Sequence, residues 1–127
     1  MAADFQTAVS EYLIRHRSVL DVLAKLQETS ARVQRAVSRA VTECGCITVR
    51  AARQQVPAGI SYHQMKDYVS THLDGRLCEH CREVLETELG HNLFYVTALC
   101  EVLNLDTSDI LRQEMKRVTT LGVFNLT

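Results

Sequence analysis

The sequence contains few residues that interrupt helices and no excess of either charge. Its 127 residues include one proline, Pro57, and five glycines. Proline and glycine are the residues that most strongly disfavour a helix interior, so their scarcity favours long helices. The 14 Lys+Arg are nearly balanced by 15 Asp+Glu. Without a basic excess, a general nucleic-acid-binding protein is not expected.

Long apolar runs are also missing. No stretch approaches the ~20 apolar residues of a membrane span, and the amphipathic N-terminus lacks the apolar core of a signal peptide. We therefore expect a cytoplasmic protein with no membrane partner. Thiols stay reduced in that compartment, so paired cysteines there indicate metal or redox chemistry more often than disulfides.

The first third of the chain carries one helical stripe. Apolar or small residues recur at steps of three and four from Val9 to Cys44, the pattern of helices packed in a bundle. A single helix of this length would be long for a domain of this size, and Ser18 begins a sequence that resembles a capping box. We predict a first helix over 4–17 and a second over 19–43.

The rest of the chain predicts three more helices, at 61–72, 78–103 and 107–117. A short extended segment is expected at 47–53, and a turn at Asp74-Gly75. The tail 121–127 has no clear pattern. The predicted fold is all-α, a single domain over 1–127 whose first 18 residues are a candidate oligomerisation segment.

Four of the five cysteines form two close pairs, Cys44-Gly-Cys46 and Cys78-Glu-His-Cys81, with 31 residues between the pairs. Zinc prefers four soft ligands at about 2.3 Å in a tetrahedron, and two short-range pairs supply them with little loss of chain entropy. One pair ends a predicted helix and the other begins one. Antiparallel packing of these helices would bring the four sulfur atoms together, so we predict a structural zinc site.

Two other interpretations of the cysteines remain open. A redox Cys-x-x-Cys also favours a helix start, but it is expected beside a βαβ pattern, which is not visible here. Alternatively, the four are unrelated core thiols, because free cysteine is often buried. His72 or His80 could replace one cysteine as a ligand, and Cys100, on an apolar face, is expected to lie in the core.

The segment Glu88–Asp106 resembles the second metal-binding helix of the MazG-type all-α nucleoside triphosphate pyrophosphohydrolases. There a Glu-x-x-Asp opens an apolar helix that is followed by a short turn and a final helix. Gln113-Glu-Met-Lys116 resembles the family's Asn-x-x-Lys, and 26–37 resembles its Glu-Glu-x-x-Glu helix. The resemblance covers 19–117. It implies a MazG-like helical bundle that binds nucleotides and assembles as a homodimer or homotetramer. One apolar belt is consistent with such assembly and consists of Leu93, Phe94, Val96 and Leu99.

The family's carboxylates, which hold Mg²⁺ for catalysis, are largely replaced. Glu28 and Glu88 match two of them, whereas Thr29, Arg32 and His91 occupy the other positions. An arginine or a neutral side chain does not replace a magnesium ligand, and imidazole suits transition metals better. The departures imply a degenerate hydrolase in which Glu28, Glu88 and His91 are vestigial catalytic candidates.

Several interpretations of this vestigial site compete. It could bind a nucleotide or another phosphate through basic residues without hydrolysing it, although such residues commonly form a solvated helix face. The candidate phosphate ligands are Lys25, Arg32, Arg35, Arg39 and Lys116. Glu88-x-x-His91 also matches the ligand unit of carboxylate-bridged metal sites. Alternatively, the helices are a scaffold for protein contacts, or the protein is an active nucleoside triphosphate pyrophosphohydrolase with an altered metal site, which would then use Mg²⁺.

Overall fold

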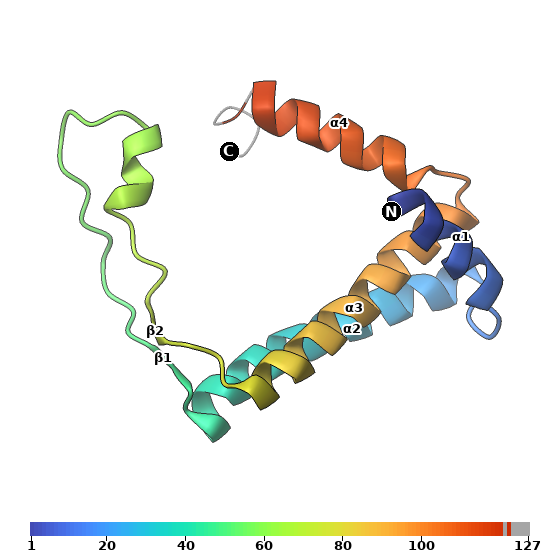
Figure 1. Ribbon diagram of the computed structural model, residues 1–127, viewed down its shortest axis with the longest axis horizontal. Helices are drawn as coiled ribbons and strands as arrows, with labels where there is room; N and C mark the ends of the chain where they lie inside the picture. The colour runs from blue at the N-terminus through green and yellow to red at the C-terminus, as the bar shows by residue number, and fades with distance from the viewer. Residues whose placement is uncertain (121, 123–127) are drawn as a thin grey trace.

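The computed structural model describes residues 1–120 and 122 (Figure 1). Its main helices are α1 (Ala2–Tyr12), α2 (Val19–Arg39), α3 (Glu79–Val102) and α4 (Thr107–Thr120). The structure also contains the π-helical turn η1 (Ala40–Cys44), the 3-10 turn η2 (His63–Asp67), and the strands β1 (Ile47–Val49) and β2 (Leu73–Gly75). The protein is therefore mostly helical, as predicted. Apart from Gly122, the tail 121–127 lies outside the described residues.

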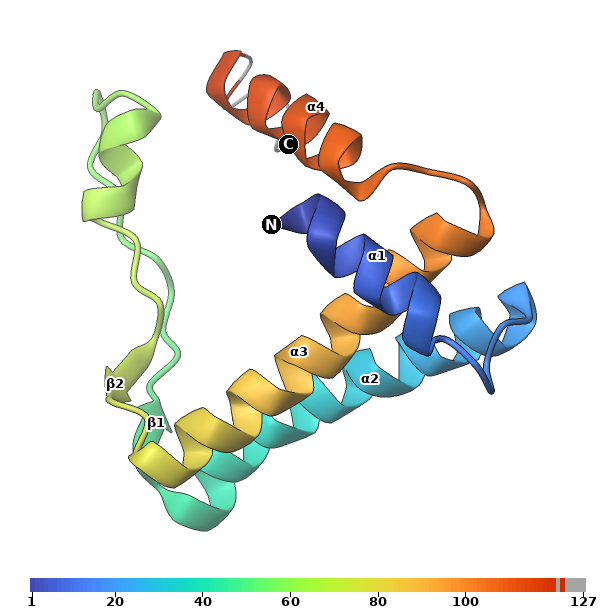
Figure 2. The same ribbon diagram turned by 45° about the vertical axis from the view of Figure 1, so that its right-hand side comes forward.

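The centre of the fold is the antiparallel pair of α2 and α3, which lie side by side along most of their length (Figure 2). Ser18 caps α2, because its Oγ accepts a hydrogen bond from the Leu20 N–H at 3.3 Å. Between the helices, Asn92 Nδ2 donates to Thr29 Oγ1 at 3.1 Å and to Ser30 Oγ at 3.0 Å. This polar contact fixes the register of the two helices at the middle of their seam.

The core lies where α1 crosses one end of this pair. Val9, Leu13, Val22 and Ala98 are its buried residues. The predicted first helix, 4–17, is wrong at its C-terminal end, because α1 stops at Tyr12. Leu13 leaves the helix with an extended backbone (φ −79°, ψ 91°) and only 2% of it is exposed. Burial of Leu13 beside Val22 thus outweighs the extra helical turn that the sequence pattern favours.

Gln6 joins α1 to the turn between α3 and α4. Its Nε2 donates to Leu105 O at 2.8 Å and to Glu101 Oε2 at 3.0 Å, and its Oε1 accepts from the Thr107 N–H at 2.8 Å. The helix α4 therefore begins at a fixed point, yet every residue from Asp109 to Thr120 is exposed. Within the described part of the chain, no helix combines the length and apolar character needed to cross a membrane.

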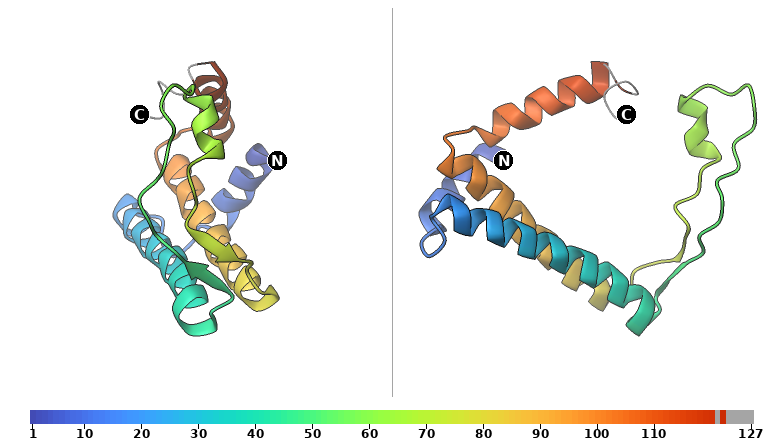
Figure 3. Two further views of the ribbon diagram at one scale, coloured as in Figure 1. Left: turned by 90° about the vertical axis from the view of Figure 1, so that its left-hand side faces the viewer. Right: turned by 180° about the vertical axis from the view of Figure 1, so that it is seen from behind.

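Residues 50–72, called the arm below, connect β1 to β2 and rise away from the helices (Figures 1 and 3). The strands pair antiparallel, with Ile47 opposite Gly75 and Val49 opposite Leu73. Further out, Gln54 Nε2 donates to Ser70 O at 2.9 Å, and the Ser70 N–H donates to Gln54 Oε1 at 2.8 Å. The arm is a long hairpin whose base is the small sheet.

Two expectations for this region are wrong. The predicted helix 61–72 is only the turn η2, although its capping box forms: the Gln64 N–H donates to Ser61 Oγ at 3.3 Å and the Ser61 N–H donates to Gln64 Oε1 at 2.9 Å. A short helix needs an apolar partner surface, which the exposed arm does not supply. Asp74-Gly75, expected as a turn, belongs to β2 because both residues pair with β1.

Gly75→Ala is expected to lower the free energy of unfolding by about 1–3 kcal/mol. Gly75 has φ +88°, and a Cβ atom there would lie 2.6 Å from Cys46 O. Urea denaturation followed by circular dichroism measures the effect. The matched control is Gly90→Ala, within α3 and with nothing within 4 Å of an added Cβ. It is expected to raise stability by up to about 1 kcal/mol. Equal stability of the two variants would contradict the position of β2 beside Cys46.

Candidate metal centre and basic furrow

Helix ends and the small sheet position the four paired cysteines. Cys44 ends η1, and Gly45 then takes the left-handed conformation (φ +78°) that turns the chain back, so that Cys46 immediately precedes β1. Cys78 is the N-cap of α3, and Cys81 lies in its first turn. Pairing of β1 with β2 brings these two short segments together.

The four Sγ atoms lie within 4.8 Å of one another. Cys44 Sγ and Cys78 Sγ are 3.7 Å apart, close to the edge of about 3.8 Å of a tetrahedron with zinc–sulfur bonds of about 2.3 Å. The prediction that the two pairs meet is confirmed. Within residues 1–120 and 122, no other group of three or more His, Cys, Asp or Glu side chains is close enough to hold one ion, and neither His72 nor His80 belongs to this one.

Hydrogen bonds within the cluster determine which thiol ionises first. The Cys81 N–H donates to Cys78 Sγ at 3.4 Å and, with the Cys81 thiol, lowers the pKa of Cys78 to about 7. The interaction with Cys78, followed by burial, raises the pKa of Cys81 to about 12. The backbone N–H of Cys46 lowers the pKa of Cys44, but the Cys78 and Cys46 thiols and burial oppose it and the net direction is upward.

The surroundings of the cluster suit a bound metal ion. All five cysteines are free; Cys44 is exposed, and Cys46, Cys78 and Cys81 are half-buried. The N-terminal end of α3 stabilises negative charge on Cys78 and Cys81. The two strands beside the cluster form an antiparallel hairpin, not the parallel βαβ unit in which a redox Cys-x-x-Cys is expected. Cys100 is 7% exposed, in the core as predicted.

A furrow runs along one side of the α2–α3 seam and reaches the cysteines. It consists of three hollows, of about 260, 340 and 380 Å³, and neighbouring hollows share lining residues. Arg32 lines the first and second, and Arg39 and Val84 line the second and third. We call it the basic furrow, because four cations of α2 line it: Lys25, Arg32, Arg35 and Arg39. Three carboxylates, Glu28, Glu43 and Glu88, line it as well.

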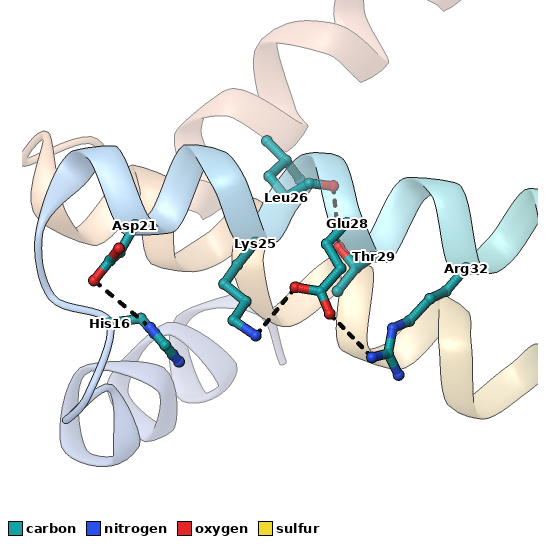
Figure 4. Close-up of polar contacts among 7 residues, drawn as sticks. All are labelled: His16, Asp21, Lys25, Leu26, Glu28, Thr29 and Arg32. Carbon is teal, nitrogen blue, oxygen red and sulfur yellow. Dashed lines mark hydrogen bonds and ion pairs between the residues drawn. The ribbon is translucent and has the colours of Figure 1, made fainter.

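The first hollow contains part of the predicted vestigial site. Glu28, Thr29, Arg32 and His91 line it together with Lys25. In Figure 4 the Glu28 carboxylate lies between two cations, with Lys25 Nζ at 3.1 Å and Arg32 Nη2 at 3.0 Å. Lys25, and then Arg32, hold the pKa of Glu28 below its usual value. This carboxylate is thus ionised and already paired, which is unfavourable for a magnesium ligand.

The other predicted site residues are distributed along the chain. Glu88 lines the second hollow with Arg32 and Arg35, and its Oε2 atom is buried without a hydrogen-bond partner among the described residues. Lys116 lies on α4 and is not among the residues that line the furrow. The predicted set of phosphate ligands is therefore split, with Lys25, Arg32, Arg35 and Arg39 along the furrow and Lys116 elsewhere.

Sequence reasoning missed the aromatic wall of the first hollow. Phe94 and Tyr95 line it and contact each other edge to face, with ring centroids 5.1 Å apart. The spacing of Tyr95 could have predicted its place, because Tyr95 follows His91 by four residues and therefore lies on the same face of α3. The predicted apolar belt also divides: Phe94 and Leu99 pack against the core, whereas Leu93 and Val96 are exposed.

Comparison of the chain with protein-family models, with curated proteins and with solved structures finds no match.

In protein stripped of metal, Cys78 is expected to react with iodoacetamide at pH 7.5 at least tenfold faster than Cys81. The thiolate is the reactive form, and the pKa of about 7 for Cys78 against about 12 for Cys81 leaves only Cys78 largely ionised. Peptide mass spectrometry at short reaction times measures both rates.

The same reaction in 6 M guanidinium chloride is the control, because unfolding removes the Cys81 N–H from Cys78 Sγ. The two rates are expected to become similar there. Equal rates in the folded protein would contradict the hydrogen-bonding pattern of the cluster.

Proposed function

We propose that this protein is a zinc-clamped, MazG-like helical protein that binds phosphate-bearing ligands, such as nucleotides, without hydrolysing them. The observation that carries the zinc part is the convergence of four free thiols within 4.8 Å. The ligand part rests on the first hollow, in which Lys25 and Arg32 lie opposite the aromatic wall. The four cysteines can bind zinc only as reduced thiolates, so the proposal places the protein in a reducing compartment such as the cytoplasm.

The chemistry of the donor set supports zinc. Four thiolates in a tetrahedral arrangement select zinc or an iron–sulfur centre over hard cations such as magnesium. Cys78 would bind as a thiolate near neutral pH, because its pKa is about 7. A bound dication would then lower the pKa values of the other three thiols. The ion would fix the C-terminal end of η1, the N-terminal end of α3 and the base of the arm to one another.

Protein purified without added metal is expected to contain about one zinc per chain. Replacement of two ligands in Cys78→Ala/Cys81→Ala should remove the zinc and lower the melting temperature, since a metal bound to the folded state adds to its stability. Inductively coupled plasma mass spectrometry and thermal unfolding measure the two effects. The matched control is Cys100→Ala, outside the cluster, which should keep the zinc. Full zinc content in the double variant would refute the site.

The first hollow combines the two groups that nucleotide recognition uses. A lysine and an arginine supply charge-assisted donors to phosphate oxygens, and the rings of Phe94 and Tyr95 supply an apolar surface. Its volume of about 260 Å³ continues into the second hollow, where Arg35 and Arg39 extend the positive charge. A triphosphate lying along the furrow would meet these cations, but it would have to compete with Glu28 for Lys25 and Arg32 and with Glu43 for Arg39.

The carboxylates argue against hydrolysis. Magnesium-dependent phosphoryl chemistry needs several acidic oxygens around the ions. Here Glu28 is held between Lys25 and Arg32, whereas Glu88 lies in the neighbouring hollow with three arginines. His91 stands where the resembled family has an aspartate. The competing function, an active pyrophosphohydrolase, would require magnesium to displace two cations from Glu28.

Glu28→Gln separates these two functions, because they predict opposite changes in the affinity for pyrophosphate. If Lys25 and Arg32 bind phosphate, removal of the carboxylate frees both cations, and the affinity for inorganic pyrophosphate should rise severalfold. If Glu28 binds magnesium, the same change should weaken ligand binding and abolish turnover. Isothermal titration calorimetry with pyrophosphate and with ATP, with and without magnesium, measures the effect.

Arg32→Ala should weaken pyrophosphate binding by about tenfold or more, the loss of one charge-assisted hydrogen bond. The matched control is Arg82→Ala, which removes an exposed arginine from an ion pair on α3 outside the furrow and should leave the affinity unchanged. Stoichiometric hydrolysis of a nucleoside triphosphate that Glu88→Ala abolishes would overturn the non-catalytic assignment.

A further inference from the structure

The four clustered cysteines differ in their access to solvent. Cys44 is exposed, whereas Cys46, Cys78 and Cys81 are half-buried. Cys44 also lines the third hollow of the furrow, which has a volume of about 380 Å³ and can therefore admit a small reagent. With zinc bound, all four sulfur atoms are thiolates, so accessibility rather than ionisation decides which of them reacts first. Cys44 is thus the member of the cluster that a small reagent in solution reaches most readily.

The sulfur atom of Cys44 is in contact with a thiol of the other cysteine pair. Its Sγ lies 3.7 Å from Cys78 Sγ, across the gap between the end of η1 and the start of α3. The neighbouring thiol of Cys46 is directed elsewhere, since its Sγ donates to Ala40 O at 3.8 Å. The geometry therefore favours Cys78 as the thiol that would react with an oxidised Cys44.

We propose that Cys44 is a site of oxidation by hydroperoxides, and that its condensation with Cys78 forms a disulfide and releases the zinc ion. This inference rests on the proposed zinc site, because the released ion is the one that the four thiolates hold. The cluster is then a redox-controlled clamp. A metal ion joins the ends of η1 and α3 under reducing conditions, and a covalent bond joins them under oxidising conditions.

The reaction takes two steps, with hydrogen peroxide as the oxidant. The Cys44 thiolate attacks one peroxide oxygen, so that an S–O bond forms, the O–O bond breaks and hydroxide leaves. The Cys78 thiolate then attacks the sulfur of the Cys44 sulfenic acid, so that an S–S bond forms, the S–O bond breaks and a second hydroxide leaves. Two thiolates together lose two electrons, and one peroxide gains them. Arg39 and His80 line the same hollow and are positioned to donate to the first leaving hydroxide.

The disulfide removes two of the four zinc ligands. The two remaining thiols, Cys46 and Cys81, do not make the closed four-ligand set of a structural zinc site, so the ion leaves. Cys44 and Cys78 are 34 positions apart, and the disulfide closes a loop that contains the whole arm. Such a cross-link stabilises the folded state by restricting the unfolded chain. Oxidation should therefore release zinc without unfolding the α2–α3 pair.

Treatment of the zinc-loaded wild-type protein with hydrogen peroxide tests the proposal. A colorimetric zinc chelator measures release of the ion, and peptide mass spectrometry after alkylation of the remaining thiols identifies the disulfide. One zinc ion should be released for each disulfide, and the first disulfide should join Cys44 to Cys78. Circular dichroism should show unchanged helical content. Reduction with dithiothreitol and addition of zinc should restore the starting metal content.

Cys44→Ser should slow peroxide-dependent zinc release at least tenfold, because it removes the accessible thiolate. The matched control is Cys100→Ala, outside the cluster, which should release zinc at the wild-type rate. If Cys44→Ser does not hold zinc, the disulfide found in the wild-type protein decides the matter alone. A first disulfide between Cys78 and Cys81, or an unchanged rate of release in zinc-loaded Cys44→Ser, would overturn the proposal.

Failure of this inference is distinguishable from failure of the zinc site. Wild-type protein that contains no zinc after purification would refute the zinc site itself. A zinc-loaded protein that keeps its zinc after Cys44 is oxidised, or that forms a different first disulfide, would refute only the redox control. Neither result depends on phosphate binding, which calorimetry tests separately.

Discussion

The meeting of the two cysteine pairs is the contact on which the rest of the structure depends. It occurs where α2 ends, α3 begins and the arm leaves the helices, so one cluster sets the positions of three segments. The opposite end of the α2–α3 pair has the core of Val9, Leu13, Val22 and Ala98. The cysteine end has no comparable apolar cluster among the described residues, and the thiols occupy the place that a core would take. Repulsion between neighbouring thiolates would make this end unfavourable at high pH without a cation, so the folded geometry and a bound metal ion support each other.

The α2–α3 pair thereby becomes a rod with two unlike sides. The polar Thr29–Asn92 contact fixes its register, the basic furrow follows one side, and the exposed apolar residues Leu89, Leu93 and Val96 of α3 lie on the other. The two ion pairs of Glu28 set a limit on the proposed phosphate binding, because a ligand would have to compete with a carboxylate already in contact with Lys25 and Arg32.

Local patterns in the sequence predicted the parts of this structure that local physics determines. Both ends of α3 were predicted to within one residue, because the spacing of its apolar residues and the position of its N-cap determine them. The convergence of the cysteines followed from their places at helix ends. Long-range packing was not predictable in the same way. The end of α1 is set by burial of Leu13, and the capping box at Ser61 does not propagate because nearly all of the arm residues around it are exposed. At the furrow, the family resemblance named Glu28 and His91 as parts of one site, and both line the first hollow. The pairing of Glu28 with both cations depends on side-chain geometry that no sequence pattern specifies.

The central claim is that the four sulfur atoms hold one zinc ion. X-ray absorption at the zinc K-edge on protein purified without added metal tests this most directly, because it counts the atoms bound to the metal. The account predicts a single shell of four sulfur atoms at about 2.3 Å. A shell that contains one nitrogen atom at about 2.0 Å would show that a histidine binds the zinc in place of one cysteine. His80, which lines the third hollow beside Cys44 and Cys81, would then be the first candidate. A shell of oxygen atoms, or a protein that contains no zinc, would contradict the account.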